Sequence, residues 1–333
     1  MDSLTQIVLG AAVAEALVGR KIENRALLYG AALGTLPDLD IFVGKLFDPI
    51  TALEIHRGFS HSIVFFMLLS PLMGVILQRF ERHNSLRWNE AATMAFLVLL
   101  THALLDIFTT WGTQLLWPLP HRFALKTIFV VDPLYTLPLL YYVLRIIKID
   151  KNEARRLKFI VRGLKISTVY LIFTGCIKLA VLNKFESNLA ENHIVYHEII
   201  VKPTPFNIIL WNANVKTATG YLLADYSFFD TRPPTYKYYP DGTHNLGSMA
   251  DAPAVKQLIN ISEGWYVISK QENRLFFNDL RFGLIDDNPE NPIFAFSYEL
   301  IPSNGQVSAI EVPKTKRDGK VLLSRLINRI GGN

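Results

Sequence analysis

The chain has 333 residues, of which 50% are hydrophobic and 19% are charged, and its mean hydropathy is +0.23. In soluble domains about a quarter of all residues are charged, so this composition argues against a wholly soluble protein. The net charge of +5 is mild and lies largely in loops beside apolar segments, which argues against nucleic acid as a partner. The single cysteine, Cys176, excludes a disulfide framework, and the first residues lack the basic region of a cleaved signal peptide.

The first half of the chain contains six apolar stretches, at about 4–19, 26–43, 62–80, 91–108, 128–147 and 164–182. A helix needs about 20 apolar residues to cross a bilayer, with about 17 as a lower limit. The last four stretches meet this requirement. The first two are interrupted by Gln6, Glu15, Asp38 and Asp40, and we expect them to be short, tilted or partly re-entrant. Residues 1–183 are therefore predicted to form an all-α polytopic membrane bundle of about five to six helices.

The distribution of basic residues predicts the orientation of this bundle in the cell membrane, either inner or plasma. The loop after the fifth stretch is strongly basic, which is typical of a cytoplasmic loop. Its basic residues are Arg145, Lys148, Lys151, Arg155, Arg156, Lys158, Arg162 and Lys165. Alternation along the six stretches then places the N-terminus, and everything after residue 183, on the extracytoplasmic side.

The segment 184–333 has the composition of a soluble, β-rich domain. Short aromatic and β-branched runs, such as 220–229, 265–268 and 293–298, are separated by clusters of proline, glycine and asparagine. The last run, 321–330, has helical periodicity with basic residues on its polar side. We expect this helix to dock on its own domain, and a membrane surface is the alternative.

Charged residues at the ends of apolar segments are the strongest functional signal, because they are costly in a membrane. Four segments bring aspartate and histidine to the same predicted outer face. The candidate metal ligands are Asp38, Asp40, His56, His61, His102 and Asp106. Three histidines and three aspartates exceed the needs of one tetrahedral site, so we predict zinc or another divalent metal, with more than one ion.

The spacing of these residues suits metal binding, although each pair also has a simpler explanation. His102 and Asp106 lie four residues apart, on one helical face, but such a pair can also be hydrogen-bonded. Asp38 and Asp40 point the same way in an extended loop, but this turn could equally cap a helix. His56 could simply lie in a loop and bind no metal.

Other polar residues near these positions are candidates for substrate binding or ligand orientation. Arg57 and Ser60 suit a substrate phosphate, whereas Arg57 could equally pair with a nearby aspartate. Asp132 could orient a ligating histidine or cap the fifth stretch. Arg122, with His121 beside it, is a weaker candidate for contact with substrate.

Several motifs together resemble one known family. They are Met1–Gln6 with Gly10, Gly34–Asp40, His56–Ser62, and His102–Asp106 followed by Thr109–Gly112. Over roughly residues 1–145 the chain resembles the YdjM/YbcI-type membrane-bound metal-dependent hydrolases. This family is distantly similar to the zinc-dependent phospholipases C and single-strand-specific nucleases. That likeness implies that Asp38 or Asp40, His56 or His61, and the pair His102 and Asp106 hold zinc ions. Many relatives carry a histidine near position 6, where this chain has Gln6.

We therefore expect a membrane-bound metal-dependent hydrolase that cleaves a phosphoester, preferably of a lipid or a lipid-linked compound, at the outer membrane face. The predicted catalytic residues are Asp38 and Asp40, as ligands or general base, and Arg57, which would bind the substrate phosphate. Membrane lipids are the expected partners. An ion-coupled transporter or channel is an alternative, as is a non-catalytic scaffold stabilised by a structural metal.

Overall fold

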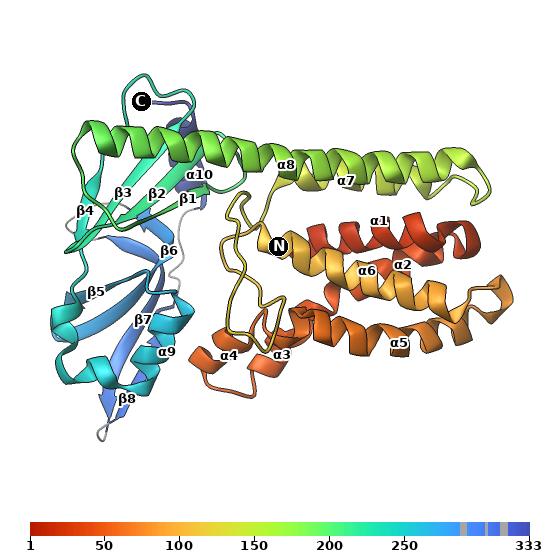
Figure 1. The fold of residues 1–333 in the computed structure, drawn as a ribbon, viewed down its shortest axis with the longest axis horizontal. Coiled ribbons are helices and arrows are strands. Elements are labelled where there is room, and N and C mark those ends of the chain that lie inside the picture. The colour runs from red at the N-terminus through yellow and green to blue at the C-terminus, as the bar shows by residue number, and fades with distance from the viewer. Residues whose placement is uncertain (287–291, 304–305, 314–318) are drawn as a thin grey trace. The chain divides into compact units, whose positions relative to one another are not determined.

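The computed structural model describes residues 1–286, 292–303, 306–313 and 319–333. It divides into two compact units. The first comprises Met1–Leu46, Ile55–Cys176 and Pro205–Asn207, and the second comprises Phe47–Glu54, Ile177–Thr204 and Ile208–Asn333. The first unit is helical and the second is built on two antiparallel sheets, so the predicted fold class is confirmed (Figure 1).

The helical part of the chain runs from α1 to α8. Its helices are α1 (Ser3–Ile22), α2 (Asn24–Thr35), α3 (Asp40–Gly44), α4 (Pro49–Ile55), α5 (Ile63–Phe80), α6 (Trp88–Ile107), α7 (Pro133–Ile146) and α8 (Ala154–Glu191). Short 3-10 turns at Pro37–Leu39, Phe59–His61 and Arg82–Asn84 join some of them. The helix α4 belongs to the second unit, and α8 begins in the first unit and ends in the second.

Four helices in the described ranges, α1, α5, α6 and α8, are long and apolar enough to cross a membrane. The segment formed by α2 and Pro37–Gly44 would be a fifth span, bent by 41°. The helix α7 has 14 residues, because Asp132 caps it and Pro133 begins it, so it is shorter than a span requires. The number of candidate spans is thus four to five.

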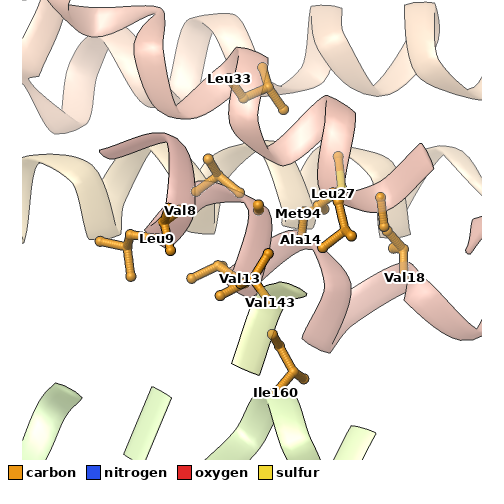
Figure 2. Close-up of a cluster of buried hydrophobic side chains, with 14 of the residues drawn as sticks. Val8, Leu9, Val13, Ala14, Val18, Leu27, Leu33, Met94, Val143 and Ile160 are labelled. Carbon is orange, nitrogen blue, oxygen red and sulfur yellow. The ribbon is translucent and has the colours of Figure 1, made fainter. Parts of the chain in front are cut away.

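The core of the first unit forms where α1 and α2 pack closely together. Val8, Val13 and Leu27 lie in this core, which Met94 of α6, Val143 of α7 and Ile160 of α8 complete (Figure 2). Small residues allow the close approach. A Cβ atom on Gly30 would lie 2.2 Å from the carbonyl oxygen of Gly10, so only glycine fits there.

A buried ion pair explains how α1 tolerates the glutamate that interrupts the first apolar stretch. Arg156 of α8 donates from Nε to Oε1 of Glu15 at 2.7 Å and from Nη2 to Oε2 at 2.8 Å. Arg156 also donates to the carbonyl oxygens of Ile146 and Ile149. The guanidinium and the carboxylate therefore satisfy each other inside the bundle, as buried charges must.

The second unit contains two four-stranded antiparallel sheets, ordered β1-β2-β3-β4 and β5-β6-β7-β8. The first sheet consists of β1 (Glu198–Pro203), β2 (Leu210–Lys216), β3 (Gly220–Ser227) and β4 (Lys237–Pro240). The second consists of β5 (Tyr266–Gln271), β6 (Arg274–Asp286), β7 (Ile293–Ser303) and β8 (Gln306–Glu311). The aromatic runs that predicted strands lie in or beside β3, β5 and β7.

The end of α8 and the helices α9 (Pro253–Ile261) and α4 pack on these sheets, and α10 (Gly319–Ile330) is held by polar contacts. The end of α8 buries Val181, Phe185 and Leu189 in one core with Trp211 of β2. The helices α9 and α4 share a second core with strands β5–β8. The C-terminal helix α10 is held at its end, where Arg329 donates to both carboxylate oxygens of Asp230.

Candidate metal centre

Four of the six predicted ligands converge at one point in the first unit. Asp38 lies in the 3-10 turn that follows α2, and His61 ends the turn that precedes α5. His102 and Asp106 project from one face near the end of α6. One donor atom from each of the four lies within 4.8 Å of every other. The group is the right size and chemistry for one metal ion.

The backbone of α2 fixes the orientation of His102. Its Nδ1 donates a hydrogen bond of 2.6 Å to the carbonyl oxygen of Gly34, so Nδ1 carries a proton and Nε2 is the nitrogen whose lone pair is available in the neutral ring. That Nε2 atom lies 3.2 Å from Nε2 of His61 and 3.6 Å from Oδ1 of Asp38. A backbone carbonyl behind the ring is a common means of aiming a ligating histidine.

His61 is oriented in the same way by its own neighbours. Its Nδ1 lies 2.9 Å from Oγ of Ser60, which in turn donates to Oδ2 of Asp40 at 2.8 Å. The other nitrogen, Nε2, lies 3.4 Å from Oδ1 of Asp38 and 3.5 Å from Oδ2 of Asp106. Burial alone would lower the pKa of His61, but the carboxylates of Asp106, Asp38 and Asp40 raise it to about 9. The surroundings of this ring therefore favour positive charge.

The arrangement of donors in this group fits a cation. When His61 releases its proton, the lone pairs of two imidazole nitrogens face each other, and two carboxylates lie beside them. The Oδ2 atom of Asp106 is buried and accepts no hydrogen bond within the described residues, which normally carries an energetic penalty. A divalent ion bound by Asp38, His61, His102 and Asp106 would neutralise this cluster and use these lone pairs.

Asp40 and His56 lie outside the group of four and form a second layer behind it. Nδ1 of His56 donates to Oδ1 of Asp40 at 2.9 Å. The other oxygen of Asp40 accepts from the backbone nitrogen of Arg57 at 3.0 Å and from Ser60. It also lies 3.4 Å from Nδ1 of His61. In this structure Asp40 orients a histidine of the group, and its role as a direct ligand stays a prediction.

Three groups hold the carboxylate of Asp106. Nε2 of Gln6 donates to Oδ1 at 3.1 Å, the amino nitrogen of Met1 contacts the same oxygen, and Nε of Arg57 lies 3.3 Å from Oδ2. The sequence presented Gln6 as a polar interruption of the first apolar stretch and as the replacement of a ligand, but not as a partner of Asp106. Its contact with Asp106 joins residues 100 positions apart, and no spacing motif signals such a contact.

Arg57 is buried and committed to partners within the site. It has a positive φ of 58°, and its Nη1 donates to Oγ1 of Thr109 at 3.0 Å. With its contact to Asp106, this geometry matches the expected alternative in which Arg57 pairs with an aspartate. Arg122 donates to the backbone carbonyl of His56 at 3.0 Å and so supports the same loop.

Asp132 is not a member of the metal group. Its carboxylate accepts hydrogen bonds from the backbone nitrogens of Leu134 and Tyr135, which makes it the N-cap of α7. It also accepts a hydrogen bond of 2.9 Å from the hydroxyl of Tyr170 on α8. These contacts correspond to the capping alternative for Asp132.

The fold and this group of side chains define a helical membrane protein with a buried Asp/His cluster that could bind a metal ion. The family model described as "YdjM inner membrane protein" matches residues 1–181, and the chain belongs to that family. The resemblance found in its motifs is thereby confirmed.

Two curated relatives match part of the chain. It is 36% identical over 104 residues to the inner membrane protein YbcI of Escherichia coli (strain K12), covering 31% of this chain and 58% of that protein. It is 30% identical over 144 residues to the uncharacterized protein YfhP of Bacillus subtilis (strain 168), covering 40% and 42% of the two chains. The chain thus spans about half the length of these curated relatives. No solved structure matches the chain.

Proposed function

We propose that this protein is a membrane-bound, metal-dependent hydrolase that cleaves a phosphoester of a lipid or lipid-linked compound. The observation that carries this proposal is the convergence of Asp38, His61, His102 and Asp106 on one point. Two imidazoles and two carboxylates form a ligand set that suits zinc. Asp40 and His56, which contact each other beside His61, are the further donors that a second ion would use.

The roles of the chain's own residues follow from their positions. A divalent ion supplies Lewis acidity and lowers the pKa of a water molecule. Asp38 is the ligand that reaches the surface, with 21% of its side chain exposed, so substrate would approach from its side. His56 is 26% exposed, and Asp40 holds its Nδ1. In the proposed step, the oxygen of a water molecule bonds to phosphorus and its proton passes to the carboxylate of Asp38 or Asp40. As the bond from phosphorus to the leaving oxygen breaks, Nε2 of His56 gives a proton to that oxygen.

Apolar side chains on the segments that carry the site support an amphiphilic substrate. Ile41, Phe42 and Val43 of α3 directly follow Asp40 and are all exposed. Phe59 is exposed beside His61, and its ring packs against that of Trp117 at 5.0 Å between centroids. Exposed apolar groups next to a polar site suit a lipid with a phosphate head group. The basic loop after α7 supports an extracytoplasmic location for the C-terminal unit.

A structural metal is the second candidate, and one observation favours it. All four positions of a tetrahedral ion can be filled by protein atoms, and three of the four residues are buried. Structural zinc sites are usually closed in this way, whereas catalytic sites keep a position open. The two functions differ in turnover rather than in metal content.

The test is a metal analysis of the purified protein beside two histidine variants. We expect His102→Ala to lose the metal and His121→Ala, which changes a histidine outside the group, to retain it. Hydrolysis is measured with bis(p-nitrophenyl) phosphate and with phosphatidylglycerol vesicles. Turnover that depends on His102 supports the hydrolase, whereas bound metal without turnover selects the structural candidate. A parent protein without metal would overturn both.

A further inference from the structure

The short helix α4 joins the two halves of the candidate metal site, yet it belongs to the other unit. Residues up to Leu46 and from Ile55 onward lie in the first unit, and Phe47–Glu54 lies in the second. The chain therefore leaves the site after Asp40, enters the second unit at α4, and returns to the site at His56. We call this segment, residues 41–55, the excursion, and we call the two residues that flank it, Asp40 and His56, its base.

Both ends of this excursion are held together at the metal site. The hydrogen bond between Nδ1 of His56 and Oδ1 of Asp40 closes its base. Oδ2 of Asp40 accepts from the backbone nitrogen of Arg57 and from Oγ of Ser60. We call these contacts of Asp40 with His56, Arg57 and Ser60 the Asp40 clamp. Through Ser60 the clamp reaches Nδ1 of His61, and thus a candidate ligand.

The tip of the excursion is anchored by buried and polar contacts within the second unit. Ile50 is 3% exposed and lies in one core with Val255 and Leu258 of α9. Nε2 of Gln257, also on α9, donates to Oε2 of Glu54 at 2.6 Å and lies 3.4 Å from Oγ1 of Thr51. Together these contacts fix both the apolar and the polar side of α4.

The length of α4 makes this anchoring decisive for its structure. It has seven residues, and isolated helices shorter than about 12 residues are marginal in water. Its N-terminus is capped by Asp48, whose Oδ1 accepts from the backbone nitrogens of Ile50 and Thr51, but a cap contributes only about 1 kcal/mol. Without the core around Ile50, we expect the helix to unfold and the excursion to lose its fixed shape.

We propose that the second unit controls the metal site by holding α4, so that Ile50 and Gln257 act as positioning residues for His61 through the Asp40 clamp. This inference rests on the proposed function only in that the site binds metal. Docked α4 keeps the base of the excursion closed and His61 oriented. When α4 is released, Asp40 and His56 are free to move relative to each other. Metal affinity then falls although no metal ligand has been substituted.

The test measures Zn²⁺ affinity of the full-length protein by competition with a chelator, and amide hydrogen exchange of residues 55–62. We expect Ile50→Ala and Gln257→Ala to weaken Zn²⁺ binding by roughly twofold to thirtyfold, the range of long-range couplings. Both variants should also speed amide exchange in 55–62. The matched control is Val201→Ala, which removes a buried side chain from β1, in a separate core of the same unit. It should leave both measurements unchanged.

A double variant tests the route through the clamp. If α4 acts through Asp40, the effect of Ile50→Ala on Zn²⁺ affinity should vanish when Asp40→Asn is already present. The proposal is overturned if Ile50→Ala speeds the exchange of α4 itself and leaves Zn²⁺ affinity equal to that of the parent. It is also overturned if Val201→Ala weakens binding as strongly. A parent that binds Zn²⁺ but cleaves no phosphoester removes the hydrolase and leaves this inference standing.

Discussion

Nδ1 of His102 donates to the carbonyl oxygen of Gly34 at 2.6 Å, and this contact joins the end of α2 to the ligand-bearing face of α6. A carbonyl oxygen can only accept a hydrogen bond, so Nδ1 must be the protonated nitrogen. The contact also directs Nε2 toward Asp38, His61 and Asp106. The packing of α1 and α2 is thereby connected to the chemistry of the site.

The glycine contact between α1 and α2 should be intolerant of any side chain. In Gly30→Ala the new Cβ would lie 2.2 Å from the carbonyl oxygen of Gly10, so the helices must move apart. We expect a loss of about 1–3 kcal/mol of stability, as for an overpacked core, seen as a lower thermal unfolding midpoint. Gly175→Ala is the control, because a Cβ there meets nothing within 4 Å and alanine favours a helix.

Asp40 should matter for metal affinity even if it does not touch the ion. Asp40→Asn removes the charge that orients His61 and His56, and the loss of such an outer partner typically costs about tenfold to a hundredfold in affinity. A Zn²⁺ titration against a competing chelator measures it. Asp132→Asn, at the cap of α7, should bind Zn²⁺ like the parent. Equal loss in both variants would contradict the division of these aspartates into two roles.

Gln6→Glu should make the stability of the folded protein depend more strongly on bound metal. The substitution replaces the amide donor 3.1 Å from Oδ1 of Asp106 with a second carboxylate, and two like charges at that distance repel. We expect a lower unfolding midpoint without metal and a larger rise on adding Zn²⁺ than the parent shows. Gln78→Glu, on an exposed position of α5, should leave that rise unchanged. An unaltered rise in Gln6→Glu would refute the contact with Asp106.

The docking of α10 should weaken in acid because of Asp230. Burial alone would raise the pKa of Asp230, but its hydrogen bonds with Arg329 hold the pKa below the usual value. A depressed carboxyl pKa stabilises the fold above the unfolded value of about 3.9, and the contribution is lost as pH falls through the folded value. Asp230→Asn should therefore unfold at a midpoint that varies less between pH 6 and pH 3.

The size of this effect follows from the burial of the pair. The carboxylate is fully buried and receives two charged hydrogen bonds, so its loss should cost about 1–3 kcal/mol at pH 6. Asp251→Asn is the control, because Asp251 and Lys256 form an exposed surface pair, and such pairs contribute little. A pH profile for Asp230→Asn that matches the parent would show that the ion pair does not hold α10.

The sequence alone predicts those parts of the site that depend on spacing along one helix or loop. His102 and Asp106 share a face because they are four residues apart, and the charge of Asp38 interrupts an apolar stretch. The strand-rich C-terminal region follows from its aromatic runs. The length of α7 could not be predicted from the sequence. The run 128–147 is apolar from its start, but the helix begins only at Pro133.

Contacts between distant residues account for what the sequence could not predict. The separation of Asp40 from the four converging residues depends on where the loop 55–61 folds back on α3, and no local pattern encodes it. The same holds for the placement of α4, which is seven residues long and gains its stability from Val255 and Leu258, about 200 positions later. The bond of Gln6 with Asp106 likewise exists only in the folded bundle.

The convergence of Asp38, His61 and His102 has a consequence for how the bundle resists unfolding. One ion bound by these side chains would close two long loops of the chain at once, and closing a loop restricts the unfolded state. Proteins of oxidising compartments often obtain such cross-links from cysteine pairs, and this chain has a single cysteine. A chelator would then do to this protein what a reducing agent does to a disulfide-bonded one.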